Sequence, residues 1–592
     1  MLEEKTNDDD KSPEPKQLSL FPDASPKVKE QEDTQTKAKK LKLTPKSAVF
    51  SYRERGDNVE PIEGLPSLTL PNRWEFLYPK IKDSDVPIQT IIRPVQSGMN
   101  VIQEIIEYLK TTGGCQVLVL RANTGSGKTT FLNTLPHYMQ NVDLHIKTFD
   151  LQYLNEDDFK DELWKFEPSD KGVNLIVLEG REKPQTVPDA YIQNILANVN
   201  RFARTKRVPM LFVIPTIEEE VARVWCEHGA TIGDLIPEKA LYDGSRWYSF
   251  PGVPKSKYLE IIEETILALN PPYTLGEYGV SPVEAKTWIE TSNSIGDFIS
   301  TTANKISSRR REARITLKGP RERVWVVYCS PDNQHYDHTY HVINGLVQDD
   351  KLKVSPVKLV PPASQAQLFK HWLGEGQWTK LVNTINFLDV RLINLPIITL
   401  TTAALAHGTD ELLMSFKETK LEKYRKKIPR AMLTENIDWD QTLADKRLQT
   451  DNARKSMERT NLFRLLRDMP AEQQKGGNPE AVKSLAQYLH LREVASETHL
   501  HYYLGLTLSD LLEYQRFPGY IDIGTETPLV QGQKSPIPDI TIYTEGTTYA
   551  LEFHFLKKQI AASEIQTYAI KNVLQKYMRD LPYLNSQLQE VS

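Results

Sequence analysis

The feature that most constrains this sequence of 592 residues is the short run ANTGSGKTT at residues 122–130. It follows the apolar run at 117–120 and precedes the helical stretch FLNTLPHYM, so we expect a strand, a loop and a helix in that order. Gly125 and Gly127 allow backbone N–H groups to curl around an anion, and the helix that follows directs its positive end at the same place. The run therefore predicts a phosphate-binding loop within an α/β domain.

This run resembles the Walker A loop of P-loop nucleotide-binding proteins, with Ala122 where the first glycine of that pattern normally stands. The resemblance implies that Lys128 reaches the β- and γ-phosphates of ATP and that the Thr129 hydroxyl binds Mg²⁺. ATP and Mg²⁺ are therefore the expected cofactors, and an ordinary Gly-Ser turn is the alternative. The other residues that we expect to bind the nucleotide are Asn123, Thr124, Gly125, Ser126, Gly127 and Thr130.

Short apolar runs alternate with helical stretches from about residue 85 to residue 275. The runs LHIKTF, NLIVLEG and PMLFVIPT are expected to be strands, and near-continuous apolar strands are typical of sheets that are covered on both faces. Strands that alternate with helices in this way predict a parallel sheet, and hence an α/β fold class for this domain.

Two side chains are expected at strand ends near the loop. Glu179 follows the run VNLIVL, where a P-loop enzyme places the Walker B carboxylate that supports Mg²⁺ or polarises water. The usual pattern is Asp then Glu, whereas this chain has Glu179-Gly180, so weakened hydrolysis is one expectation and a plain strand-end carboxylate is the alternative. Thr216 follows the run LFVI closely, at the position of the polar sensor residue of AAA+ proteins. The order of these motifs resembles that of AAA+ ATPases over roughly residues 85–275.

The AAA+ resemblance also implies a homo-oligomer, because arginine fingers in that family act across subunits. The sequence does not distinguish one arginine from the others. The candidates are Arg201, Arg204, Arg223 and Arg246.

A second pattern lies in residues 505–592. Asp539 opens an apolar strand and, after a short turn, the run YALEFHF carries Glu552 and His554, which alternation places on one face of their strand. The pattern resembles the core of PD-(D/E)xK nucleases, a small restriction-endonuclease-like α/β fold. The resemblance implies that Asp539 and Glu552 bind Mg²⁺ and that these two carboxylates and His554 are catalytic in phosphodiester cleavage. The family normally has a lysine where His554 stands.

The departure at His554 leaves alternatives open. A neutral imidazole does not supply the fixed positive charge of a lysine, and Lys557 points to the opposite face of a regular strand. The resemblance also assigns Glu513 as the family's helical carboxylate and residues 563–577 as the helix that packs on the core. The alternatives are an ordinary hairpin with one edge carboxylate, or an inactive nuclease fold that binds DNA.

Residues 1–60 are expected to be a disordered tail, since the first 50 hold ten acidic residues, ten basic residues and five prolines. An apolar island within this tail consists of Gln17, Leu18, Ser19, Leu20 and Phe21. It resembles the short peptide by which many bacterial proteins bind the replication sliding clamp, so the clamp is an expected partner. The alternative is a chance apolar island.

Residues 281–500 are predicted to form a mainly helical middle domain, with one strand-like stretch at 324–330. Residues 301–323 hold eight basic and two acidic residues, a net charge of +6, and a second basic run spans 417–430. Because the whole chain has a net charge of −5, a nucleic-acid surface has to be a local patch, and basic runs of this kind suit contact with a phosphate backbone. A solvated helix face is the alternative.

Composition narrows the class of protein further. Three cysteines cannot form a disulfide framework or a four-cysteine zinc site, so we expect a reduced, cytoplasmic setting. The longest apolar stretch, LINLPIITLTTAALA, is too short and too polar to span a bilayer, and the N-terminus has no signal-peptide core. No membrane association is therefore expected.

The motifs together predict an ATP-hydrolysing DNA-processing protein with several domains, one of them a metal-dependent nuclease-like domain. By analogy, this combination points to bacterial defence against phage or mobile elements. The rival hypothesis is a non-cleaving, ATP-dependent DNA-binding adaptor linked to transposition or replication. A third hypothesis is a nucleotide-sensing oligomerisation switch with little turnover, which Glu179-Gly180 permits.

Overall fold

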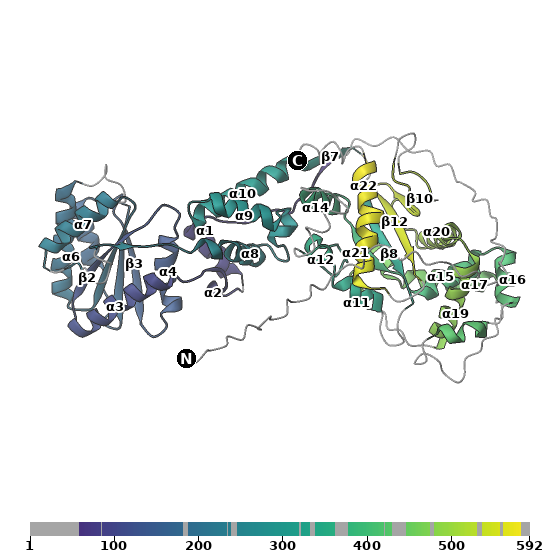
Figure 1. Cartoon of the computed structure of the whole chain (residues 1–592), viewed down its shortest axis with the longest axis horizontal. Helices are drawn as coiled ribbons and strands as arrows, with labels where there is room; N and C mark the ends of the chain where they lie inside the picture. The colour runs from purple at the N-terminus through teal and green to yellow at the C-terminus, as the bar shows by residue number, and fades with distance from the viewer. Residues whose placement is uncertain are drawn as a thin grey trace, which may run out of the picture. The chain divides into compact units, whose positions relative to one another are not determined.

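The computed structural model describes residues 59–84, 86–180, 188–233, 235–237, 245–318, 321–331, 338–361, 377–418, 421–428, 446–473, 479–529, 535–556 and 560–581. They form two compact units (Figure 1). We call Leu65–Ala313 the P-loop unit, and the described parts of Met1–Gly64 and Arg314–Ser592 the mixed-sheet unit. The expected clamp-binding segment at 17–21 lies outside the described residues. None of the described helices combines the length and hydropathy needed to cross a membrane.

The P-loop unit contains a five-stranded sheet in the order β3-β4-β5-β2-β6, in which every neighbouring pair is parallel. The prediction of a parallel α/β sheet is therefore confirmed. The strands are β2 (Cys115–Arg121), β3 (Leu144–Asp150), β4 (Val173–Glu179), β5 (Met210–Thr216) and β6 (Tyr248–Ser249).

Both faces of this sheet are buried, because successive side chains of a strand enter two different hydrophobic clusters. Val117 and Val119 of β2 belong to a cluster shared with α5, α6 and α7, whereas Leu118 and Leu120 belong to a cluster shared with α3 and α4. A strand buried in this way has no polar face, which explains its continuous apolar sequence. The helices are α3 (Gln96–Thr112), α4 (Lys128–Tyr138), α5 (Glu156–Lys165), α6 (Asp189–Lys206) and α7 (Glu219–Thr231).

A helical part with its own hydrophobic cluster completes the P-loop unit. Phe298 of α10 is a fully buried member of this cluster, and Leu68 and Leu70 pack against the cluster. We expected the ATPase domain to span 85–275, and the unit extends beyond both limits because these flanking segments bury apolar side chains against α8. The elements are α1 (Trp74–Asp83), α2 (Ile88–Ile91), η3 (Lys255–Lys257), α8 (Tyr258–Leu269), η4 (Leu275–Tyr278), α9 (Pro282–Thr291) and α10 (Ile295–Glu312).

The mixed-sheet unit contains a five-stranded sheet in the order β10-β11-β12-β8-β9. Neighbours among β10, β11 and β12 are antiparallel, whereas β8 is parallel to both β12 and β9. The ranges 281–500 and 505–592, which we expected to be two domains, thus share one sheet, since parallel pairing of strands so far apart leaves no local signal in the sequence. The strands are β8 (Arg321–Cys329), β9 (Arg391–Asn394), β10 (Tyr520–Thr525), β11 (Ile540–Thr544) and β12 (Thr547–Phe555).

Helices cover both faces of this sheet. Figure 1 shows α20 and the C-terminal helices α21 and α22 beside this sheet. The ring of His501 in α20 packs on Phe553 and Phe555, and the opposite face of β12 contacts the C-terminal helices through Tyr568 and Tyr577. A separate two-stranded sheet pairs β1 (Val59–Glu63) with β7 (Arg314–Lys318). The remaining elements are α11 (His338–Asn344), α12 (Pro356–Leu359), α14 (Trp378–Phe387), α15 (Ile397–His407), α16 (Asp410–Glu418), η6 (Leu421–Lys427), α17 (Lys446–Glu458), α18 (Asn461–Leu466), α19 (Pro479–Val494), α20 (Glu497–Tyr514), α21 (Ala562–Thr567), η8 (Tyr568–Leu574) and α22 (Gln575–Asp580).

Candidate functional site

The expected phosphate-binding loop joins β2 to α4, which is the strand–loop–helix context that the sequence predicts. Gly125 and Gly127 have φ values of 76° and 92°, in the left-handed region that favours glycine. The start of α10 lies against the loop, because the Gly296 N–H donates to the Gly125 carbonyl at 3.0 Å. A Cβ at Gly125 would lie 2.6 Å from the Ser294 Oγ, so the loop has to carry glycine here.

Lys128 is buried beneath this loop, with 8% of its surface exposed. Its Nζ donates to the Ala122 carbonyl at 2.9 Å and to the Thr216 carbonyl at 3.4 Å. Ala122 follows β2, and Thr216 ends the neighbouring strand β5. Lys128 and Thr216 therefore lie next to each other at the carboxyl edge of the sheet.

Two hydroxyl groups at this edge lack the partners that buried polar atoms normally have. The Oγ atoms of Ser126 and Thr216 are buried, and neither has a hydrogen-bond partner among the described residues. Phosphate oxygens or the water ligands of Mg²⁺ are groups that satisfy such hydroxyls. The orphaned hydroxyls and the glycine cradle thus fit ATP and Mg²⁺.

Glu179 ends β4, and β5 lies between β4 and β2 in the sheet. The residue opposite Glu179 on β3 is Asp150, a second carboxylate that the sequence analysis did not single out. Gly180 has φ 92°, and a Cβ there would lie 2.4 Å from the Asp150 Oδ1 and 2.7 Å from the Gln152 N. Gly180, which stands where the usual pattern has a second acidic residue, is therefore required because Asp150 and Gln152 lie too close for any side chain.

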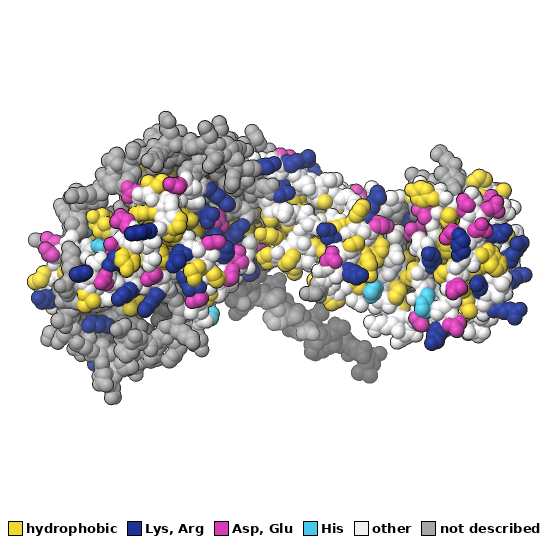
Figure 2. All heavy atoms as spheres, turned by 180° about the vertical axis from the view of Figure 1, so that it is seen from behind, with side chains coloured by type: hydrophobic (Ala, Val, Ile, Leu, Met, Phe, Trp, Pro, Cys, Tyr) yellow, Lys and Arg dark blue, Asp and Glu magenta, His cyan; other side chains and the backbone are white. Residues whose placement is uncertain are grey.

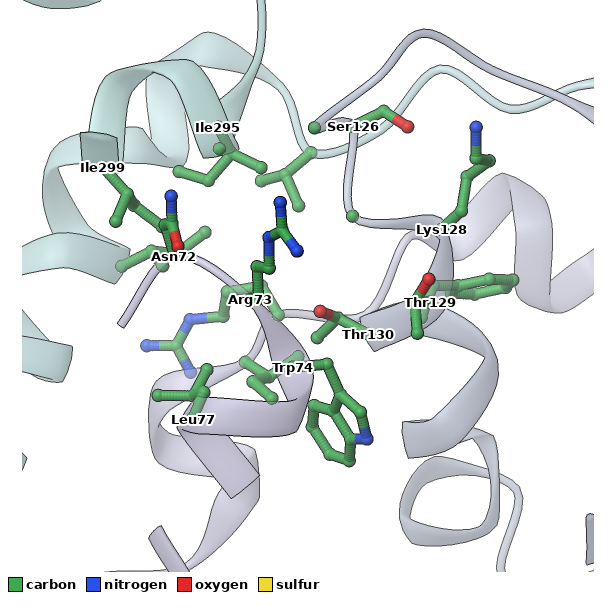
Figure 3. A pocket seen from close by; sticks show the side chains of 18 of the residues that line it. Asn72, Arg73, Trp74, Leu77, Ser126, Lys128, Thr129, Thr130, Ile295 and Ile299 are labelled. Atoms are coloured by element: carbon green, nitrogen blue, oxygen red, sulfur yellow. The ribbon is translucent and has the colours of Figure 1, made fainter. Parts of the chain in front are cut away.

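A cavity of about 380 Å³ opens beside the loop and contains residues that lie before the expected domain. Figure 3 shows the Arg73 side chain directed into this cavity, between the loop and the α10 residues Ile295 and Ile299. The Arg73 guanidinium has no hydrogen-bond or ion-pair partner among the residues that the structure describes. Arg93 also lines the cavity but is held by Glu260 and Glu264 at 2.9 and 2.6 Å.

Many residues in the walls of this cavity are apolar, and its polar side chains come from the loop and from Asn72, Arg73, Glu75, Arg93 and Thr265. Apolar walls with a few polar groups are typical of sites for small organic ligands such as a nucleotide base. Sequence reasoning missed these walls because they come from α1, α2, α8 and α10, outside the motif. The apolar lining residues include Trp74, Leu77, Ile91, Ile92, Val253, Ile261, Ile295 and Ile299.

The second group of predicted residues lies at one end of the mixed sheet. Asp539 precedes β11, and its Oδ2 accepts a hydrogen bond from the Phe553 N–H of β12 at 2.6 Å. Asp539, His501 of α20 and Glu526 after β10 each offer a ligand atom, and these atoms lie within 4.8 Å of one another. His501 Nδ1 is 2.8 Å from Glu526 Oε1, and its Nε2 is 3.6 Å from Asp539 Oδ2.

His501 is a functional candidate that the sequence analysis missed. It is 4% exposed, on a helix face otherwise formed by apolar residues such as Leu500, Leu504 and Leu508. A buried histidine on such a face is the signal that was available in the sequence. The carboxylate expected on this helix, Glu513, lies in its last turn and is not one of the three clustered groups.

Glu552 is buried at 4% exposure and is held by α22. Its Oε1 accepts hydrogen bonds from Lys576 Nζ at 2.9 Å and from Tyr577 OH at 2.8 Å. Burial raises the pKa of Glu552 to about 7 and also raises the pKa of Asp539, although Lys576 acts in the opposite direction on both. Two buried carboxylates that influence each other in this way are the donor set that a divalent cation stabilises.

His554 lies on the same face of β12 as Glu552 but has a different environment. Its ring stacks on Tyr568 with the centroids 3.9 Å apart and meets the edge of Tyr328 at 6.0 Å. Burial lowers the pKa of His554, which favours the neutral ring. The cation that reaches Glu552 is Lys576, and Lys557 lies outside the described residues.

The basic run at 301–323 is divided between the two units, because the boundary after Ala313 falls within it. In α10, Arg309 is ion-paired with Glu284. Arg321 and Arg323 belong to β8 of the mixed sheet.

Comparisons with known proteins add little to this geometry. No model of a known protein family and no curated protein matches the sequence. Solved structures that resemble it include the Orc1 protein of Aeropyrum pernix in complex with DNA (10% identity, TM-score 0.26, covering 68% of this chain and 94% of that one). A second is Cdc6p from Pyrobaculum aerophilum (10% identity, TM-score 0.28, covering 76% of this chain and 100% of that one). A third is Drosophila ORC bound to AT-rich DNA and Cdc6 (12% identity, TM-score 0.24, covering 74% of this chain and 72% of that one). Scores this low carry no argument, so the assignment of the loop depends on its own geometry.

Proposed function

We propose that this chain binds and hydrolyses ATP at the P-loop unit and acts on nucleic acid through the mixed-sheet unit. The observation that carries the first part is the loop itself. The loop combines two left-handed glycines, a buried lysine and the orphaned hydroxyl of Ser126, and the orphaned hydroxyl of Thr216 lies at the same carboxyl edge of the parallel sheet.

Each residue of the site has a defined task in this proposal. The backbone N–H groups of residues 123–128 would hold the β-phosphate, and Lys128, which now donates to the Ala122 carbonyl, would bind the β- and γ-phosphates. The Thr129 hydroxyl would hold Mg²⁺, which would offset the negative charge of the phosphates. Glu179 orients the attacking water, and Thr216 contacts the γ-phosphate. ATP turnover is expected to be slow, because β4 ends in a single carboxylate, Glu179, where the usual pattern has two.

ATP turnover by the full chain tests this part. Lys128→Ala should abolish hydrolysis, whereas Lys110→Ala, which removes an exposed lysine from α3 of the same unit, should leave it unchanged. Equal turnover in the wild-type protein and in Lys128→Ala would refute the assignment, provided that circular dichroism shows both to be folded.

The mixed-sheet unit is proposed to be a divalent-metal-dependent nuclease of the PD-(D/E)xK type. The order α20, β10, β11, β12 and α21–α22, with β8 parallel to β12, is compatible with the core of that family. Asp539, His501 and Glu526 would hold Mg²⁺, because their ligand atoms lie within 4.8 Å of one another, and the ion would supply an activated water for attack on phosphorus. Lys576 stands beside Glu552 and supplies the positive charge that His554 does not.

Cleavage and metal binding test this second part together. Asp539→Ala and His501→Ala should each weaken Mn²⁺ binding, measured by calorimetry, and remove cleavage of DNA without changing ATP turnover. Lys571→Ala, on the same stretch of helix as Lys576, should leave both properties intact. The nuclease proposal fails if the wild-type protein cuts no DNA or RNA with Mg²⁺ or Mn²⁺, with or without ATP.

A non-cleaving DNA-binding adaptor is the second candidate function. The observation that favours it is the packing of His554 against Tyr568 at the position of the family's lysine. His554→Lys distinguishes the two candidates, since a gain of cleavage indicates a weakened site and no cleavage in either protein supports the adaptor. Three further properties are also proposed for this chain. They are sliding-clamp binding through residues 17–21, assembly of protomers when ATP binds, and a role in bacterial defence.

A further inference from the structure

The segment before α1 brings an arginine into the cavity beside the phosphate-binding loop. Among the described residues, the cations that line this cavity are Arg73, Arg93 and Lys128. Lys128 donates to the carbonyl groups of Ala122 and Thr216, and Arg93 is ion-paired with two glutamates of α8. The guanidinium of Arg73 has no partner within the part of the chain that the structure describes, so it is available to a ligand.

Residues 67–73, which we call the leading segment, are fixed to the helical part of the P-loop unit. The Thr69 N–H donates to Asn270 Oδ1 at 2.6 Å, and the Thr69 carbonyl accepts from Asn270 Nδ2 at 2.8 Å. The Tyr278 hydroxyl donates to the Ser67 carbonyl at 2.9 Å. Because Asn270 follows α8 and Tyr278 ends η4, the leading segment is held by the helices rather than by the sheet.

The backbone of Arg73 is held on both sides. Directly before it, Asn72 Nδ2 donates to the Ser300 hydroxyl of α10 at 2.9 Å. Arg73 is the N-cap residue of α1, and its carbonyl accepts from the N–H groups of Phe76 and Leu77 at 3.2 and 2.9 Å. The arginine is therefore tied to α1 and α10, and its side chain reaches the cavity from the helical part.

The face of α10 at this cavity carries no charge of its own. The residues of α10 that line the cavity are Ile295, Gly296 and Ile299. Figure 3 shows Ile295 and Ile299 beside the Arg73 side chain. Once a ligand fills the cavity, apolar neighbours of this kind exclude water, which strengthens the attraction between opposite charges. Arg73 is thus a cation that the helical part can offer to a phosphate.

The loop and Lys128 belong to the sheet, since the loop joins β2 to α4. The helical part meets the loop at the first turn of α10, where the Gly296 N–H donates to the Gly125 carbonyl at 3.0 Å. This contact does not require a ligand. A contact between Arg73 and a phosphate group on the loop would require one, so it would make the closeness of the helical part to the sheet depend on the ligand.

We propose that Arg73 binds the phosphate chain of a nucleotide held by the loop and thereby draws the helical part towards the sheet. A guanidinium matches phosphate oxygens in geometry and charge, and such charge-assisted hydrogen bonds are the strong ones. Because the leading segment is fixed before a ligand binds, little more than the side chain of Arg73 has to be ordered. The proposal rests on the ATP part of the proposed function and adds a response of the helical part to the phosphates.

Figure 2 shows basic and acidic side chains interspersed on the face drawn there, so the charge of that face does not by itself mark an anion site. Recognition of a phosphate chain in this proposal depends on a few oriented groups inside the cavity instead. These groups are the loop, Lys128 and Arg73.

Arg73→Gln in the full chain tests the contact, with Lys80→Gln as the matched control. Lys80 is an exposed cation in the last turn of α1 and does not line the cavity. Calorimetric titrations with ATP, ADP and adenosine compare the variants with the wild-type protein. Arg73→Gln should raise the Kd for ATP about tenfold and leave the Kd for adenosine unchanged, and the control should change neither. An equal loss for ADP places the contact at the α- or β-phosphate, and a smaller loss places it at the γ-phosphate.

Hydrogen exchange at saturating ATP tests the response of the helical part. ATP should slow the exchange of backbone amides in α8 and α10 of the wild-type protein and of Lys80→Gln. In Arg73→Gln the same amides should stay at their rates without ATP, although the loop is occupied. A purely structural role of Arg73 would instead change these rates in the absence of ATP.

Equal Kd values for ATP in Arg73→Gln and Lys80→Gln, with both proteins folded by circular dichroism, would make Arg73 an exposed arginine only and overturn the proposal. Equal losses for ATP and adenosine would overturn it as well. If the wild-type protein binds no ATP, the ATP proposal fails, and thermal stability with inorganic triphosphate decides on Arg73. Stabilisation of the wild-type protein but not of Arg73→Gln supports the phosphate contact, and no stabilisation of either protein overturns it.

Discussion

Gly180→Ala is expected to destabilise the P-loop unit for a reason that also explains the unusual residue after Glu179. At φ 92° an alanine costs about 1–2 kcal/mol relative to glycine. Its Cβ would also lie 2.7 Å from the Gln152 backbone N and 2.4 Å from Asp150 Oδ1. Overlap of this kind costs about 1–3 kcal/mol more, because the backbone that follows β3 has to move.

Comparison with Gly113→Ala isolates the cost of the steric overlap from the cost of the backbone strain. Gly113 also has a left-handed φ, 66°, but a Cβ there would meet no atom within 4 Å. Both variants bear the backbone strain, and only Gly180→Ala bears the overlap. The difference of about 1–3 kcal/mol corresponds to roughly 2–12 °C in Tm for a unit of this size. Thermal denaturation of the full chain, with the transition of the P-loop unit identified by its response to ATP, measures it, and equal losses of Tm in both variants would refute the reasoning.

Further predictions concern single groups. Arg73→Ala should raise the Kd for ATP about tenfold while the Kd for adenosine stays unchanged. The reason is that Arg73 has no partner among the described residues and is proposed to contact phosphate. An equal loss of affinity for both ligands would contradict this. Glu179→Gln should lower ATP turnover more than ATP affinity, and the reverse order would remove it from the role of orienting water. Without metal, the free energy of unfolding should fall as the pH rises from 4.5 through about 7. In this range the folded state binds more protons than the unfolded state, because the pKa of Glu552 is raised in the folded protein. Glu552→Gln should remove this pH dependence. A peptide of residues 14–24 should bind the sliding clamp and lose binding when Leu20 and Phe21 are replaced by alanine.

The sequence predicted what is local. The loop at 122–130 carries its glycines, lysine and threonines within one turn, so its position between β2 and α4 followed directly from the pattern. The continuous apolar runs predicted a parallel sheet because burial on both faces leaves no other composition. Thr216 was predictable for the same reason, since the ends of neighbouring parallel strands meet at one edge.

The sequence did not predict what depends on contacts between distant segments. Arg73 enters the cavity beside the loop because α1 packs against α8, and no pattern near residue 73 indicates this. His501 reaches Asp539 only after α20 lies on the sheet. The pairing of β8 with β12 joins segments more than two hundred residues apart, so the middle region was interpreted as a separate domain. Each of these features is set by tertiary packing rather than by local spacing.

Calorimetric titration of the full chain with ATP in the presence of Mg²⁺ tests the central claim most directly. The account predicts binding of one ATP for each chain by the wild-type protein and no measurable binding by Lys128→Ala, with the two proteins equally folded. Absence of binding by the wild-type protein, or the same affinity in both proteins, would contradict it.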